Sequence, residues 1–139
     1  MSKSILIVED SNEDYYAFSR ILKQIGHGSA ISRLEHGDDA LNYIHTINDN
    51  LESAPSIIFL DLNMPGTDGR EILQTIKTHD TLRQLPVIII TTSANPRDIQ
   101  FCYKNGANGY MVKPVDYEKL NTSIRAIMSY WFDVMTLPA

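Results

Sequence analysis

The sequence lacks the features that mark several distinct classes of protein. Cys102 is the single cysteine, which excludes an internal disulfide and any metal site with several cysteine ligands. No apolar run approaches the roughly 20 residues of a membrane-spanning helix. No apolar signal segment precedes residue 5, so we expect a cytoplasmic protein without membrane contact. Basic runs are also missing, and the net charge of −5 argues against a nucleic-acid partner.

The remaining composition is typical of one globular domain. The chain has 139 residues, and 43% of them are hydrophobic, which is enough to form a single core. Cys102 falls in a segment with helical periodicity, so we expect a buried helix residue rather than a redox group. The histidines show no metal-like spacing and are expected to be solvated: His27, His36, His45 and His79.

An apolar run that ends abruptly in a carboxylate is the strongest single signal in the sequence. Residues 57–60 read Ile-Ile-Phe-Leu, which predicts a strand buried on both faces, and Asp61 follows directly. A turn at Met64, Pro65 and Gly66 comes next. In open parallel sheets, ligands bind at the carboxyl ends of the strands. Asp61 is therefore predicted to lie at a binding edge.

Polar groups also end three other strand-like runs, at Glu9 with Asp10, at Thr91 and at Lys113. One such group alone carries little information, because strands end at the surface, where charged residues are common. Together, these groups indicate a binding site if the strands are parallel neighbours. A single edge of the sheet would then collect three acids, a hydroxyl and an ammonium group.

Strand-like and helical patterns alternate along the whole chain. Short strand-like runs occupy residues 5–8, 29–34, 57–60, 87–90 and 110–112. Helical spacing of apolar residues follows each run, at residues 11–25, 40–47, 68–78, 95–105 and 116–131. Such alternation requires right-handed crossovers and a parallel sheet covered on both faces. We predict a doubly wound, five-stranded α/β fold of flavodoxin-like topology, with strand order 2-1-3-4-5.

Capping residues mark the starts of several predicted helices. Ser11 precedes the first helix, and Asp14, three residues further on, suggests a capping box. Asn95 followed by Pro96 marks the fourth helix, and Asp116 marks the fifth.

The predicted edge favours chemistry with phosphate and a metal ion. Carboxylates on adjacent strands repel one another, and a hard divalent cation relieves this repulsion. A site with few protein ligands and room for water is typical of magnesium. With the metal bound, Asp61 can act as a nucleophile toward a phosphoryl donor, because the cation neutralises charge on the transferring oxygens. Lys113 and the Thr91 hydroxyl could each contact a phosphoryl oxygen, and an aspartyl phosphate is the predicted covalent state.

In their strand contexts, these residues resemble the receiver domains of two-component response regulators. The resemblance covers about residues 3–130. It implies that Asp61 is the phosphoacceptor. It also implies that Glu9, Asp10 and Asp61 hold magnesium together with the backbone carbonyl of Asn63.

The same resemblance assigns roles to residues in or next to the last two predicted strands. It implies that Thr91 and Lys113 contact the phosphoryl group and that Tyr110 is a switch aromatic coupled to Thr91. It further implies a cis peptide bond between Lys113 and Pro114. Such a domain catalyses only its own phosphorylation and dephosphorylation, so we expect no enzyme activity on a separate substrate.

The C-terminal residues narrow the resemblance. Residues 130–139, together with the segments 8–11, 68–71 and 91–93, are similar to response regulators paired with cyanobacterial phytochromes. The phosphoryl donor implied is the phosphohistidine of a bilin-bearing, light-regulated histidine kinase. We expect a receiver domain at residues 1–130 that acts by contact with an unknown downstream protein. No second domain is expected to follow it.

A homodimer is also implied by this subfamily, and the tail at residues 131–139 is one candidate for the contact. The alternative is that Trp131 and Phe132 cover the base of the domain's own core. Tyr103, Tyr110 and Tyr117 are expected to add to the dimer face.

Three other functions fit these residues less well than a phosphorylated switch does. A phosphatase of the haloacid dehalogenase type carries a second aspartate two residues after its nucleophile, where this chain has Asn63. A flavodoxin-like nucleotide site needs a phosphate loop after the first strand, but Glu9 and Asp10 place negative charge there. A dimerising receiver that signals without phosphorylation is the remaining alternative, and the intact acidic set disfavours it.

Overall fold

Five parallel strands form a single sheet in the computed structural model, which describes residues 3–26, 28–47 and 51–138. The strands are β1 (Ser4–Val8), β2 (Ala30–Leu34), β3 (Ile57–Leu60), β4 (Val87–Thr91) and β5 (Gly109–Val112). Their order is β2-β1-β3-β4-β5, and every pairing is parallel. The predicted doubly wound fold and its strand order are confirmed.

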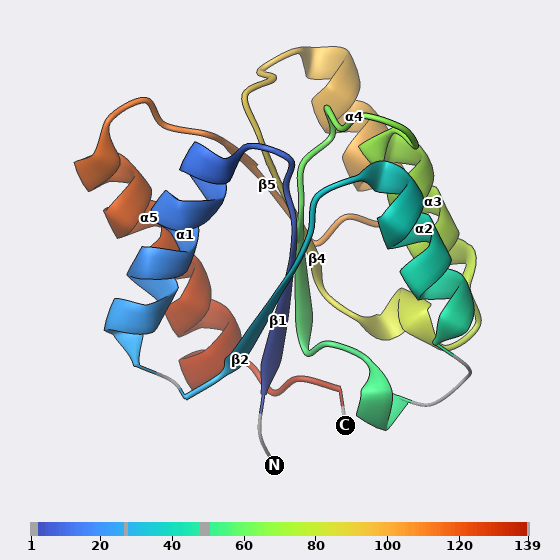
Figure 1. Ribbon diagram of the computed structural model, residues 1–139, viewed down its shortest axis with the longest axis horizontal. Coiled ribbons are helices and arrows are strands. Elements are labelled where there is room, and N and C mark those ends of the chain that lie inside the picture. Colours follow the sequence, from blue (N-terminus) through green and yellow to red (C-terminus); the bar gives the residue numbers. More distant parts are fainter. Residues whose placement is uncertain (1–2, 27, 48–50, 139) are drawn as a thin grey trace.

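Helices cover both faces of the sheet (Figure 1). The main helices are α1 (Asn12–Ile25), α2 (Gly37–Thr46), α3 (Gly69–Thr78), α4 (Pro96–Lys104) and α5 (Tyr117–Met128). Helices α1 and α5 lie on one face, and α2, α3 and α4 lie on the other (Figure 1). The shorter helical segments are η1 (Leu51–Ser53), η2 (Leu82–Gln84) and the π-helical η3 (Ser129–Val134). In the part of the chain described, no helix is long and apolar enough to cross a membrane.

Two apolar layers, one on each side of the sheet, form the core. Every residue of β3 is buried, because both of its faces pack against helices. In the layer under α1 and α5, the rings of Phe18 and Phe59 meet edge to face at 4.8 Å. In the opposite layer, Cys102 is fully buried, as expected, and burial raises the pKa of its thiol to about 11. The thiol therefore stays protonated at neutral pH.

The predicted helix caps are present, but the capping box predicted at Ser11 and Asp14 is only half formed: the Asp14 N–H donates to the Ser11 hydroxyl oxygen at 3.2 Å, and the reciprocal bond is absent. The capping side chains accept hydrogen bonds from backbone N–H groups of the first turn: Ser11, Asn95 and Asp116. In a capping box, the Asp14 carboxylate would accept from the Ser11 N–H. That N–H donates instead to Glu9 at 3.2 Å, and the Asp14 carboxylate binds Lys113. A charged ammonium is a stronger partner for a carboxylate than a neutral amide.

The expectation that every histidine is solvated is wrong for His79. Its Nδ1 accepts hydrogen bonds from the backbone N–H groups of Thr81 and Leu82, at 3.1 and 3.0 Å. The ring thus satisfies donors at the start of η2, where a helical segment has no internal acceptors. His36 and His45 are exposed, as expected, and His27 lies outside the described residues.

The C-terminal segment packs on the core of the domain. Helix α5 passes directly into η3, so the predicted boundary at residue 130 falls inside a helical segment. Phe132 is only 6% exposed, and Trp131 and Leu137 pack half-buried against the same apolar layer. The Lys3 ammonium lies 4.9 Å from the centre of the Phe132 ring and donates to the Phe132 carbonyl at 3.1 Å. These contacts tie the C-terminal segment to the N-terminal end of β1.

Candidate functional site

The strand ends that were predicted to converge lie at one edge of the sheet. Four strands supply the residues there: Glu9 and Asp10 after β1, Asp61 after β3, Thr91 at the end of β4, and Lys113 after β5. The Asp61 N–H donates to the Val8 carbonyl at 3.1 Å, so the pairing of β1 with β3 extends up to the acidic residues. The topology thus brings these side chains together from positions far apart in the sequence.

Close packing of α3 against the end of β3 holds Asp61 in place. A Cβ on Gly69 would lie 2.3 Å from the Asp61 carbonyl oxygen, so only glycine fits at the start of this helix. The Gly69 N–H donates to the Leu62 carbonyl at 3.0 Å, and the Asn63 N–H donates to the Asp61 carboxylate at 3.2 Å. The aspartate is therefore fixed from both its backbone and its side chain.

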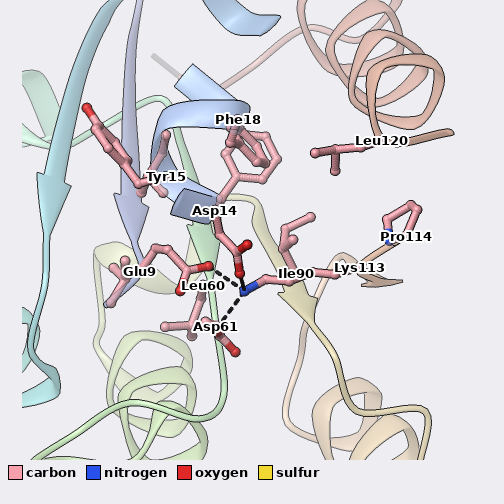
Figure 2. Close-up of a pocket in the computed structure, with 13 residues that line it drawn as sticks. Glu9, Asp14, Tyr15, Phe18, Leu60, Asp61, Ile90, Lys113, Pro114 and Leu120 are labelled. Atoms are coloured by element: carbon pink, nitrogen blue, oxygen red, sulfur yellow. Dashed lines mark hydrogen bonds and ion pairs between the residues drawn. The ribbon is translucent and has the colours of Figure 1, made fainter. Parts of the chain in front are cut away.

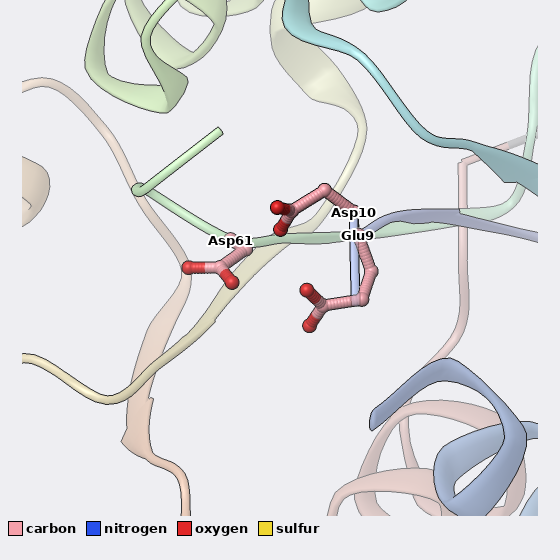
Figure 3. Close-up of side chains that lie close together, drawn as sticks. All are labelled: Glu9, Asp10 and Asp61. Carbon is pink, nitrogen blue, oxygen red and sulfur yellow. The ribbon is translucent and has the colours of Figure 1, made fainter. Parts of the chain in front are cut away.

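Glu9, Asp10 and Asp61 form an acidic triad (Figure 3). One carboxylate oxygen from each lies within 4.8 Å of the others. Glu9 and Asp61 are 5% and 7% exposed, whereas Asp10 is open to solvent. Buried carboxylates at this spacing repel one another, and oxygen is the ligand that hard divalent cations prefer. The donor set therefore fits a cation such as Mg²⁺ with one side open to water.

Lys113 offsets part of this negative charge through contacts with Glu9 and Asp61 (Figure 2). Its Nζ donates to Glu9 at 2.5 Å, to Asp14 at 2.8 Å and to Asp61 at 3.0 Å. Burial acts to lower the pKa of Lys113. Hydrogen bonds to Asp14 and Glu9, together with the charge of Asp61, outweigh burial and raise the pKa above its usual range. Lys113 is therefore charged at neutral pH.

Glu9 binds its proton unusually tightly for a carboxyl group. Burial raises the pKa of Glu9, the charge of Asp61 adds to this effect, and the contact with Lys113 opposes both, so that the net pKa is about 7. A proton on Glu9 and a metal ion in the triad exclude each other, because a carboxylate must be ionised to bind a cation.

This shift predicts a pH dependence for the metal-free protein. Unfolded Glu9 releases its proton near pH 4.5, whereas folded Glu9 keeps it until about pH 7. The folded state binds more protons within that window, so the free energy of unfolding should fall as pH rises through it. Urea unfolding in EDTA, at a series of pH values, measures this slope. Glu9→Gln should lack the Glu9 part of the slope, and equal pH profiles for the two proteins would contradict the assignment.

Thr91 and Tyr110 are connected through Ser93. Thr91 is fully buried, and its hydroxyl oxygen accepts from the Ser93 N–H at 3.4 Å. The Tyr110 hydroxyl donates to the Ser93 carbonyl at 2.9 Å, with its ring half-buried against the core. The Lys113 N–H donates to the Thr91 carbonyl at 2.7 Å. The hydroxyl, the aromatic ring and the lysine are thus joined by a few short contacts.

An ion-pair network that the sequence analysis missed anchors the loop between β4 and α4. Arg70 of α3 binds Asp98 of α4 at 2.6 Å, and Asp98 accepts from the Ser93 hydroxyl at 2.5 Å. Hydrogen bonds from Ser93 and Arg70 hold the pKa of Asp98 below its usual range. Because Ser93 also contacts Thr91 and Tyr110, this network ties the predicted switch residues to α3.

Asp14 contributes to the site in a way that its sequence position did not predict. It was assigned to a helix cap, but its carboxylate contributes to the site through Lys113. A signal was present, since Asp14 lies in the first turn of the helix that follows Glu9 and Asp10.

The expected cis bond between Lys113 and Pro114 is wrong, because no peptide bond in the described residues is cis. Lys113 reaches its carboxylate partners from a trans bond, the form that X–Pro sequences ordinarily favour. The Asn63 carbonyl remains a predicted metal ligand.

An apolar hollow of about 40 Å³ adjoins Lys113 on the side of α1 and α5 (Figure 2). Phe18, Ile90, Pro114 and Leu120 are among the residues that line it. The aliphatic part of the Lys113 side chain therefore lies next to apolar residues, while its ammonium contacts the carboxylates.

A doubly wound sheet whose carboxyl edge collects an acidic triad, a buried threonine and a lysine is the architecture of receiver domains. The chain belongs to this family: its residues 5–125 match the response regulator receiver domain. Two similar proteins are the response regulator Rcp1 of Synechocystis sp. and the probable methanogenesis regulatory protein FilR2 of Methanothrix harundinacea. Rcp1 is 35% identical over 138 residues, covering 99% of this chain and 94% of that protein. FilR2 is 35% identical over 127 residues, covering 91% and 82%.

Solved structures of response regulators have the same fold as this chain. The phosphorylated cyanobacterial phytochrome response regulator RcpA has a TM-score of 0.91 at 31% identity and covers 100% of both chains. The Mn²⁺-bound form of Rcp1 has a TM-score of 0.90 at 35% identity and covers 99% of both chains. The chain is thus a response regulator receiver that works in a two-component phosphorelay.

Proposed function

We propose that Asp61 is the residue that accepts the phosphoryl group. The observation that carries this proposal is the position of its carboxylate, which belongs to the acidic triad and is also bound by Lys113 at 3.0 Å. A phosphoryl group on Asp61 would have cation ligands on one side and an ammonium donor on the other. The buried Thr91 hydroxyl supplies a further donor from β4. The chain would in this way catalyse its own phosphorylation and dephosphorylation.

Glu9, Asp10 and Asp61 are the residues that would hold Mg²⁺, with the backbone carbonyl of Asn63 as a further ligand. Their all-oxygen donor set supports this assignment, as does the Mn²⁺-bound form of the similar Rcp1. The bound cation would neutralise negative charge on the transferring oxygens. Asp10, which is exposed, would hold the cation at the open side of the triad.

Thr91 and Tyr110 would report the phosphorylated state to the surface. A phosphoryl group on Asp61 would draw the Thr91 hydroxyl toward it and away from the Ser93 N–H. The Tyr110 hydroxyl, which donates to the Ser93 carbonyl at 2.9 Å, would then move with that loop, and its half-buried ring would turn further inward. The surface of α4 and α5 would change as a result, and with it the choice of partner.

The donor that fits this chain best is the phosphohistidine of a bilin-bearing phytochrome kinase in the cytoplasm. Similarity to RcpA and Rcp1 along nearly the whole chain supports this choice. The test is transfer of labelled phosphate from a phosphorylated phytochrome kinase domain, with an unrelated histidine kinase as control. We expect rapid labelling that requires Mg²⁺ and stops in EDTA. Labelling by acetyl phosphate but by neither kinase would reject the phytochrome assignment and leave the receiver role in place.

A homodimer is the second proposed contact, and exposed aromatic residues support it. Tyr103 on α4, Tyr117 on α5 and Tyr130 on η3 are 52%, 39% and 50% exposed, while Trp131 and Phe132 serve the domain's own core. The complete acidic triad disfavours a module that dimerises without phosphorylation. Gel filtration before and after phosphorylation distinguishes the two, because only a phosphorylated switch changes its elution.

A further inference from the structure

The Lys113 ammonium has no spare donor in this structure. An ammonium group carries three N–H donors, and Lys113 uses them on Glu9, Asp14 and Asp61. The acceptors come from the end of β1, the first turn of α1 and the end of β3 (Figure 2). The donor on Asp61 can pass directly to a phosphoryl oxygen there, but a second phosphoryl oxygen can accept from Lys113 only if the contact with Glu9 or Asp14 is weakened or broken.

Asp14 differs from the other two acceptors. Glu9 and Asp61 belong to the acidic triad, whereas Asp14 lies outside it on α1 with 44% of its side chain exposed. Figure 2 shows its carboxylate reaching the ammonium from the side of α1, away from Asp61. Its contact with the site runs through Lys113 at 2.8 Å.

We propose that Asp14 is a positioning residue that competes with a phosphoryl group on Asp61 for the Lys113 ammonium. This inference rests on the proposed phosphorylation of Asp61. Before phosphorylation, Asp14 holds the ammonium between α1 and the end of β3. Afterwards, Lys113 must divide its donors between the phosphoryl oxygens and Asp14. The phosphorylated state is then less stable than it would be with Lys113 bound to the phosphoryl group alone.

Electrostatic interactions predict that the Asp14 charge weakens the binding of a phosphoryl group at Asp61. The Asp14 carboxylate offsets part of the ammonium charge and also repels an incoming phosphoryl group. Both effects vanish when its charge is removed. A residue that only fixed the lysine would act in the opposite sense, because its loss would let the ammonium move away from the phosphoryl group. The sign of the effect therefore separates the two roles.

Beryllofluoride, which mimics an aspartyl phosphate without a transfer step, provides the test. Its affinity for the chain would be measured by calorimetry in Mg²⁺, for wild type and for Asp14→Asn. The variant is expected to bind about tenfold more tightly, because the ammonium loses a competing charge. Glu13→Gln is the matched control. Glu13 is an exposed acid in the same helical turn and is not among the acceptors of Lys113, so its change should stay within about twofold.

A double-mutant cycle shows whether the effect passes through the lysine. In a Lys113→Met background, Asp14→Asn should change the affinity by less than about twofold. Equal or weaker binding by Asp14→Asn would overturn the proposal, and so would tighter binding that persists without Lys113. If wild type bound no beryllofluoride in Mg²⁺, the phosphorylation of Asp61 itself would be refuted. The two failures are thus distinguishable.

Discussion

Asp61→Asn should take up phosphoryl groups from acetyl phosphate at least about a hundredfold more slowly than wild type, because the nucleophile is lost. An amide oxygen can still accept from the Asn63 N–H and from Lys113, so the fold should remain intact. Intact mass spectrometry after incubation in Mg²⁺ measures uptake directly. Thermal unfolding of the same samples checks that the variant is folded.

Asp10→Asn is the matched control for this variant. It keeps the nucleophile but removes an exposed carboxylate from the triad. Its phosphorylation should be slower at low Mg²⁺ and recover as the concentration rises, because weaker metal binding is overcome by mass action. Uptake by Asp61→Asn at the wild-type rate would show that another residue is the acceptor.

Lys113→Ala is expected to have the second-largest effect, on both stability and switching. Its ammonium is buried among three carboxylates, which the substitution leaves without a cation. Removing one partner from a buried ion pair costs about 3–5 kcal/mol. In EDTA at neutral or higher pH, the free energy of unfolding should fall by about that amount. Mg²⁺ should restore much of the loss, because the metal can supply the missing positive charge. Urea unfolding with and without Mg²⁺ measures both changes.

The same variant tests the proposed switch. Lys113→Ala should still bind Mg²⁺, because the triad is complete without the lysine. It should lose the link between the phosphoryl group and the end of β4, where the Lys113 backbone meets Thr91. Phosphorylation should then leave gel-filtration elution unchanged. A phosphorylation-dependent shift as large as that of wild type would exclude Lys113 from the switch.

The sequence predicted the fold and the convergence of polar side chains at one edge of the sheet because both depend on local patterns and on one topological rule. Alternating strand and helix patterns allow few arrangements, and the carboxyl ends of neighbouring parallel strands share an edge. The sequence alone therefore predicts that Glu9, Asp61 and Lys113 lie together. Cys102 and the caps at Ser11 and Asn95 followed from periodicity and from helix-start chemistry.

The contacts that the sequence did not reveal are made by long side chains that join positions far apart in the chain. Asp14 and Lys113 are 99 positions apart, and Arg70 and Asp98 are 28 apart, so no periodic pattern connects either pair. Asp14 also satisfied a local rule, the capping box, which a stronger charged partner overrode. His79 was misassigned for a similar reason, because its ring nitrogen satisfies backbone donors that no sequence pattern reveals.

The most direct test of the central claim is to locate the phosphoryl group on the chain. Wild-type protein phosphorylated in Mg²⁺ would be reduced with borohydride, which converts an aspartyl phosphate into homoserine, and then digested and sequenced by tandem mass spectrometry. We predict homoserine at position 61 and intact aspartate at position 10. Homoserine at another position, or none in a sample whose intact mass shows the adduct, would contradict the assignment of Asp61.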